Sequence, residues 1–166
     1  MRLRVAGPVC AALTMHQSIE TAALFGHPEL EAVQSRMRQV ADWLTRAGVR
    51  VIVAEAGKGV GAERIPESEL ADEADLFIAV GGDGTMLYAA RLAVGHGIPL
   101  LGINLGRLGF LTDVSPDEIE RSLQAVLDRR ALTETRLLLE ATVTRPDGEP
   151  CTGLAFNDVV QGQPCA

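Results

Sequence analysis

The chain has no excess of basic residues, few cysteines and no long apolar run. Among its 166 residues, 15 Lys and Arg stand against 22 Asp and Glu, which gives a net charge of −7. Such an acidic chain lacks the basic face that nucleic acids and membrane surfaces usually require, and no apolar run reaches membrane-spanning length. We therefore expect neither nucleic acid nor membrane as a partner. A small anionic ligand stays possible, because backbone amides can bind anions locally.

The cysteines and the N-terminus bear on the compartment. An odd number of cysteines without a C-x-x-C pair disfavours a disulfide framework or a zinc site and favours a reducing cytoplasm; they are Cys10, Cys151 and Cys165. The opening "MRLRVAGPVCAAL" has two arginines and an apolar stretch, as a secretion signal does, but Gly7 and Pro8 interrupt it. We expect residues 1–18 to be a poorly ordered extension, with a signal peptide as the alternative.

From residue 19 to residue 128, apolar runs alternate with helical patterns. The runs predict strands at 19–26, 49–55, 76–80 and 98–104. Helices are expected from Pro28, from Thr85 and from Ser115; the apolar stripe of the first is Leu30, Val33, Met37, Val40, Ala41 and Leu44. This order predicts an α/β fold with a doubly wound parallel sheet, Rossmann-like and covered on both faces.

Three finer features accompany that pattern. The glycine-rich stretch 56–66 is expected to be a loop, a short acidic segment spans 67–75, and "ADEAD", residues 71–75, is expected to be a solvated face. Ser115, Pro116 and Glu118 have the order of a helix cap, a first-turn proline and a capping box.

Residues 129–166 change character. The stretch 136–145 predicts a strand whose expected face is Leu137, Leu139, Ala141 and Val143. The "PDG" turn signal and 151–160 suggest a returning strand. Because two strands rarely stand alone in water, they pack on the first domain, pair with another copy or begin a β-rich second domain. We assign 19–128 to the α/β domain and 129–166 to the start of the second.

The string "GGDGT", residues 81–85, follows the predicted strand 76–80. In a doubly wound sheet ligands lie at the carboxyl ends of the strands, and glycines before a helix favour a bound phosphate. The string is neither a Walker A loop nor a dinucleotide fingerprint. Asp83 repels phosphate, but it can accept the proton of an attacking hydroxyl or help to hold Mg²⁺. The alternative is that Asp83 merely stabilises a turn.

Three motifs together resemble the NAD kinase family. "GGDGT" is similar to a signature shared with lipid kinases and phosphofructokinases; "GINLGRLGFLTDV", residues 102–114, and "FNDVV", residues 156–160, narrow the resemblance to NAD kinases. It implies a phosphofructokinase-like fold and a phosphotransferase that makes NADP from NAD. The phosphoryl donor would be ATP or polyphosphate with Mg²⁺ or another divalent cation, and the full-length protein would be a homo-oligomer.

The resemblance also implies roles for residues. Asp83 would be the general base for the 2′-hydroxyl of the adenosine ribose, and Gly84 would lie against NAD. Asn157 and Asp158 would hydrogen-bond NAD. The triphosphate and metal region would be lined by Gly81, Gly82 and Thr85, and the nucleotide site shaped by Asn104, Gly106 and Gly109. The glycines of "NLGRLGF" could instead serve only turns, and Phe110 and Leu111 are expected in the core.

Two departures from the family affect the expected activity. Tyr88 stands where many members carry Arg or His, and no Thr- and Gly-rich stretch follows Val160. We therefore expect little or no kinase activity from the isolated 166 residues. The alternatives are a catalytically incomplete nucleotide-binding module and a lipid or sugar kinase of the same superfamily.

Overall fold

A computed structural model describes residues 2–8, 18–57, 59–105, 111–112, 114–144 and 150–155. Five strands form a parallel sheet in the order β4-β3-β2-β5-β6; they are β2 (Thr21–Gly26), β3 (Arg50–Ala54), β4 (Glu63–Ile65), β5 (Leu76–Val80) and β6 (Leu100–Ile103). The helices are α1 (Glu31–Arg46), α2 (Leu70–Glu73), α3 (Asp83–Ala93) and α4 (Ile119–Leu127), with 3₁₀ turns η1 (Glu67–Glu69) and η2 (Pro116–Glu118). The expected doubly wound α/β fold is thereby confirmed.

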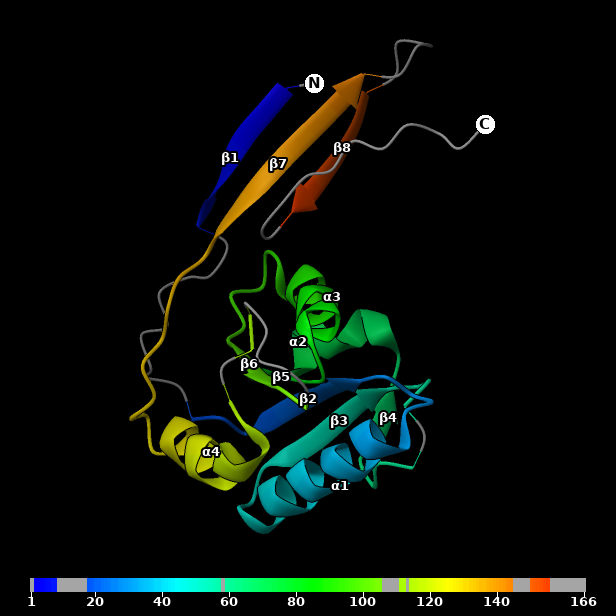
Figure 1. Ribbon diagram of the computed structural model, residues 1–166, viewed down its shortest axis with the longest axis vertical. Coiled ribbons are helices and arrows are strands. Elements are labelled where there is room, and N and C mark those ends of the chain that lie inside the picture. Colours follow the sequence, from blue (N-terminus) through cyan, green and yellow to red (C-terminus); the bar gives the residue numbers. More distant parts are fainter. Residues whose placement is uncertain are drawn as a thin grey trace.

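The sheet is covered on both faces (Figure 1). Successive residues of a strand point to opposite faces, and β5 divides accordingly: Leu76, Ile78 and Val80 pack with α1 and α4. Phe77 and Ala79 pack with α2 and α3 in a second cluster. All five residues of β5 are buried, which explains why its sequence is apolar throughout rather than alternating.

A second sheet, antiparallel and in the order β1-β7-β8, lies apart from the parallel one along the molecule (Figure 1). Its strands are β1 (Arg2–Pro8), β7 (Leu137–Thr144) and β8 (Pro150–Ala155). The expectation of poor order in residues 1–18 is therefore wrong for β1, whose register runs from Arg2 opposite Thr142 to Pro8 opposite Leu137. The apolar–polar alternation at the N-terminus was the available signal, but its partner lies far along the chain.

Several local expectations are also wrong. Leu30 is 54% exposed, and Gln34 is the polar residue that α1 buries instead. Glu63–Ile65, expected in a loop, pairs with β3 as the edge strand β4. The Ser115 hydroxyl donates to the Glu118 carboxylate at 3.0 Å, so the predicted capping box does not form, although Pro116 does open the turn. On β7, Ala141 of the predicted face is buried, and so is Leu138, which lies on the opposite face.

Asp75 belongs to the predicted solvated segment but has a structural role. Its Oδ2 accepts hydrogen bonds from the backbone amides of Glu20 and Thr21, both at 2.9 Å. These amides open β2, and a charged acceptor makes such bonds stronger than neutral ones. Asp75 therefore fixes where β2 begins beside β5.

Arg50 links three elements at the same end of the sheet, because it pairs with Thr21. Its guanidinium donates to both carboxylate oxygens of Glu63 at 2.8 and 2.9 Å and to Glu73 at 2.7 Å. The bond from Arg50 lowers the pKa of Glu63 below its ordinary value of 4.5, and the same carboxylates raise the pKa of Arg50 further.

A pH-dependent loss of stability follows for Arg50→Met. A carboxylate with a lowered pKa stabilises the fold above its unfolded pKa and loses that effect as pH falls through the folded pKa. At neutral pH the variant should therefore unfold at a lower urea concentration than the parent. This gap between the two urea midpoints should close below pH 4.5. Because the groups are exposed, the gap should be small and should shrink in high salt. A gap that stays constant from neutral pH to about pH 3 would contradict this assignment.

No helix within the described part of the chain is both long enough and apolar enough to cross a membrane.

Candidate functional site

The connections of the parallel sheet change direction between β2 and β5. From β2 the chain proceeds to β3 on one side, whereas from β5 it proceeds to β6 on the other. In open α/β sheets the crevice at such a switch point, outside the carboxyl ends of the strands, receives the ligand. Gly26 of β2 pairs with Val80 of β5, so His27 and Gly81 leave the sheet beside each other there.

The turn Gly81–Thr85 opens α3 at this switch point. Gly81 has φ +154°, and a Cβ there would lie 2.6 Å from Thr85 Oγ1, so only glycine fits. The Gly82 carbonyl accepts hydrogen bonds from the amides of Thr85 at 3.0 Å and Met86 at 3.2 Å. Gly82 and Gly84 are exposed. The N-terminus of α3 therefore lies at the carboxyl end of β5, where the helix dipole favours an anion.

Asp83 is the first residue of α3 and is half-buried. Its Oδ1 accepts a hydrogen bond from the Leu111 amide at 3.1 Å, across 28 positions of the chain. The carboxylate is thus held by a segment that follows β6 as well as placed by its own helix. Leu111, predicted as core, is half-buried, and its backbone contacts the candidate site.

Asn104 follows β6 and is 4% exposed. The Gly81 amide donates to the Ile103 carbonyl at 2.9 Å, and the Asn104 amide donates to the Val114 carbonyl at 2.9 Å. The structure therefore brings Asn104 into the same region as the turn 81–85. Gly106, Gly109, Asn157 and Asp158 lie outside the described residues, and their roles stay predictions.

Tyr88 stands on α3 five residues after Asp83. Its hydroxyl donates to the Glu67 carboxylate, and its ring meets Phe25 edge-on with the centroids 6.1 Å apart. Burial, followed by the bond to Glu67, raises the pKa of Tyr88 to about 12. The side chain is thus a neutral donor at neutral pH and connects α3 to η1 rather than supplying a positive charge.

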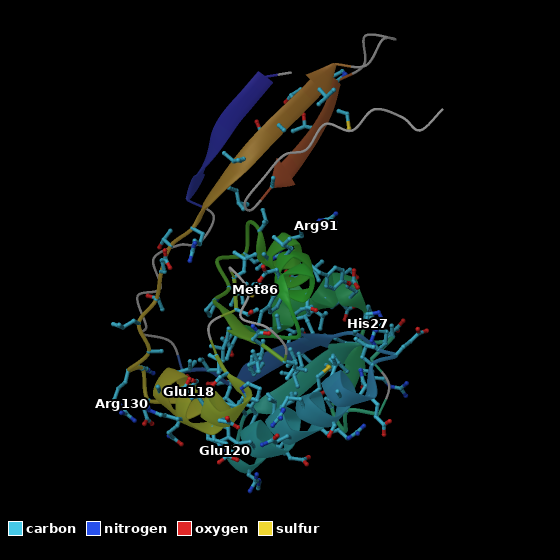
Figure 2. All side chains as sticks on the ribbon, viewed as in Figure 1. His27, Met86, Arg91, Glu118, Glu120 and Arg130 are labelled. Carbon is cyan, nitrogen blue, oxygen red and sulfur yellow. The ribbon has the colours of Figure 1, made fainter. Side chains whose placement is uncertain are left out.

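A cavity of about 590 Å³ lies elsewhere, between α3, β6, α4 and the chain that leads to β7. Met86, on the α3 side of the sheet, lines it, whereas Glu118 and Glu120 lie below with α4 (Figure 2). Leu111 and Gly102 also line the cavity, but Asp83 does not. Among the described residues, no group of three or more His, Cys, Asp and Glu is arranged to hold a metal ion.

His27 directly follows Gly26, the last residue of β2. Figure 2 shows it at the end of β2, away from α4. Its Nδ1 accepts a hydrogen bond from the Glu29 amide at 3.3 Å.

A glycine-rich turn and a helix N-terminus at the switch point of a parallel sheet define an open α/β domain of the nucleotide-binding class. The chain belongs to the NAD kinase family, since the profile of the ATP-NAD kinase N-terminal domain matches residues 22–131. It is 43% identical over 148 residues to an NAD kinase of Teredinibacter turnerae, covering 87% of this chain and 50% of that protein. An NAD kinase of Methylococcus capsulatus is 38% identical over 149 residues, covering 88% and 51%.

A solved structure shares the fold. The yeast NADH kinase crystallised with NADH superposes with a TM-score of 0.76 at 20% sequence identity, over 93% of this chain and 52% of that one. The chain thus spans about half the length of the relatives it matches.

Proposed function

We propose that this chain is the nucleotide-binding half of an NAD kinase, which transfers a phosphoryl group from ATP or polyphosphate to the 2′-hydroxyl of the adenosine ribose of NAD. The observation that carries the proposal is the position of Asp83 in a chain of this family. The carboxylate stands at the start of α3, at the switch point of the sheet, with Oδ1 held by the Leu111 amide.

Each of the described residues has a proposed role that follows from its chemistry. Asp83 takes the proton of the 2′-hydroxyl as the ribose oxygen bonds to the terminal phosphorus of the donor, and the bond from that phosphorus to the bridging oxygen of the leaving ADP or shortened polyphosphate breaks. Gly81 and Gly82 let a phosphate approach the backbone, and the Gly84 and Thr85 end of α3 favours its charge. Asn104 borders the nucleotide. Gly106, Asn157 and Asp158 are proposed nucleotide contacts on the motif resemblance alone.

A divalent cation fits this site only together with the donor. Because the described residues offer no cluster of three ligands, they do not make a protein cage for a metal. Mg²⁺ commonly keeps several waters and binds through one or two carboxylates plus substrate phosphates. It would neutralise phosphate charge when bound. We also propose, from the family, a cytoplasmic location and a homo-oligomeric full-length protein.

The test is NADP formation by the full-length gene product with NAD, ATP and Mg²⁺, read by an enzymatic cycling assay. We expect NADP from NAD, and no phosphorylation of diacylglycerol or sphingosine under the same conditions. The absence of NADP, with ATP and NAD still binding in calorimetry, would favour the nucleotide-binding module instead. Phosphorylation of a lipid would favour the other kinase class.

The isolated 166 residues are expected to give no measurable turnover. The reason is that they span half of the relatives' length, and the remaining groups around the nucleotide are proposed to lie in the other half. Assaying this chain beside the full-length product checks the point. Ordinary turnover by the chain alone would contradict it.

A further inference from the structure

The chain returns to the edge of β6 shortly after leaving it. Val114 forms a parallel bridge with Ile103; its amide donates to the Gly102 carbonyl at 3.2 Å, and its carbonyl accepts from the Asn104 amide at 2.9 Å. We call Leu111, Thr112 and Val114 the β6 latch. Its backbone bonds fix these residues along the strand that also borders the turn 81–85.

Thr112 seats the latch on Gly102. Its side chain is fully buried, and a Cβ at Gly102 would lie 2.9 Å from Thr112 Cγ2, 3.2 Å from Thr112 Cα and 3.3 Å from the Leu111 carbonyl oxygen. The latch therefore approaches β6 to a distance that tolerates no side chain at position 102. Among the residues that the structure describes, the Thr112 hydroxyl has no hydrogen-bond partner, so packing of its methyl group makes this contact.

The contact between Thr112 and Gly102 also places the backbone amide of Leu111 against the Asp83 carboxylate. Leu111, adjacent to Thr112, donates its amide to Asp83 Oδ1 at 3.1 Å. On the other side of β6, the Ile103 carbonyl accepts from Gly81 at 2.9 Å. One strand thus anchors both the turn that carries Asp83 and the segment that orients its oxygen.

We propose that Gly102 and Thr112 are positioning residues, which set the orientation of the Asp83 carboxylate through the Leu111 amide. The catalytic consequence rests on the proposed function; the geometric one does not. A displacement of about 1 Å can cost up to about a hundredfold in rate. A methyl group added at Gly102 should therefore displace the Asp83 carboxylate and slow the reaction, although the methyl group touches no substrate.

Hydrogen exchange at the Leu111 amide tests the geometry in the 166-residue chain itself. Gly102→Ala should speed exchange at Leu111 about tenfold or more, and Asp83→Ala should do the same because it removes the acceptor. Gly153→Ala is the matched control, since a Cβ there meets nothing within 4 Å. Unchanged Leu111 exchange in Gly102→Ala would overturn the proposal.

A second pair of variants covers the case in which Gly102→Ala does not fold. Thr112→Val keeps the branched shape and the Cγ2 methyl group and replaces only the hydroxyl with a methyl group, so exchange at Leu111 should match the parent. Thr112→Ala removes the methyl group and should speed exchange. When Thr112→Ala is combined with Gly102→Ala, exchange at the Leu111 amide should be slower than in Gly102→Ala alone. The reason is that the 2.9 Å contact with the Thr112 methyl group is removed, while the backbone contacts at 3.2 and 3.3 Å stay. If the Leu111 amide exchanged equally fast in Thr112→Val and Thr112→Ala, the Thr112 methyl group would not hold this segment on Gly102, and the proposal would be wrong.

Kinetics of the full-length gene product test the consequence for Asp83. Gly102→Ala should lower kcat about tenfold and leave KM for NAD and ATP within about twofold. A rise in KM with kcat unchanged would refute a positioning role. If exchange at Leu111 behaves as expected but the parent protein forms no NADP, the proposed function fails and the latch geometry stands.

Discussion

Asp83→Asn is expected to reduce kcat for NADP formation by about a hundredfold or more in the full-length gene product. An amide has nearly the shape of a carboxylate, and its oxygen can still accept the bond that Leu111 donates to Asp83 Oδ1. It cannot take a proton from a hydroxyl at neutral pH, and general-base catalysis contributes about 10²- to 10⁴-fold. The melting temperature should stay close to that of the parent.

The control for this variant is Asp117→Asn. Asp117 lies in η2, exposed and remote in sequence from the turn, so its loss of charge should leave kcat unchanged. The two variants change the net charge by the same amount, which separates a local role from a general electrostatic one. If Asp83→Asn keeps kcat within about threefold of the parent, Asp83 is not the general base.

The parallel sheet was predictable because its strands are continuous apolar runs. Residues 76–80 were predicted as a strand and form β5 with the same limits. The edge strand β4 was missed because Glu63–Ile65 is short and polar and is held by pairing with β3. Its strand character depends on tertiary contact rather than on local preference.

Part of the candidate site was likewise predictable from the sequence, and part was not. Gly81, Asp83 and Thr85 are neighbours in the sequence, so a motif alone places them together. The bond between Leu111 and Asp83 spans 28 positions, and the seat of Thr112 on Gly102 depends on how closely the chain returns to β6. Neither hydrophobic spacing nor a short motif encodes such a contact, and for that reason Leu111 was interpreted only as a core residue.

The second large effect is a loss of stability, expected when a core side chain of β5 is truncated. Phe77 lies on β5 with no exposed surface, and its ring packs against Phe25 with the centroids 4.7 Å apart and the planes at 55°. Phe77→Ala should lower the free energy of unfolding by about 3–5 kcal/mol, from lost burial and the cavity left behind. That is a large part of the 5–15 kcal/mol typical of a domain.

Urea denaturation of the 166-residue chain measures this loss. Leu132→Ala is the control: Leu132 is fully exposed, so the variant should change stability by less than about 0.5 kcal/mol. Because β5 leads directly into Gly81 and Asp83, loosening it should also speed exchange at the Leu111 amide, whereas Leu132→Ala should not. A loss below about 1 kcal/mol in Phe77→Ala would mean that the α2 and α3 face of the sheet is not packed as described.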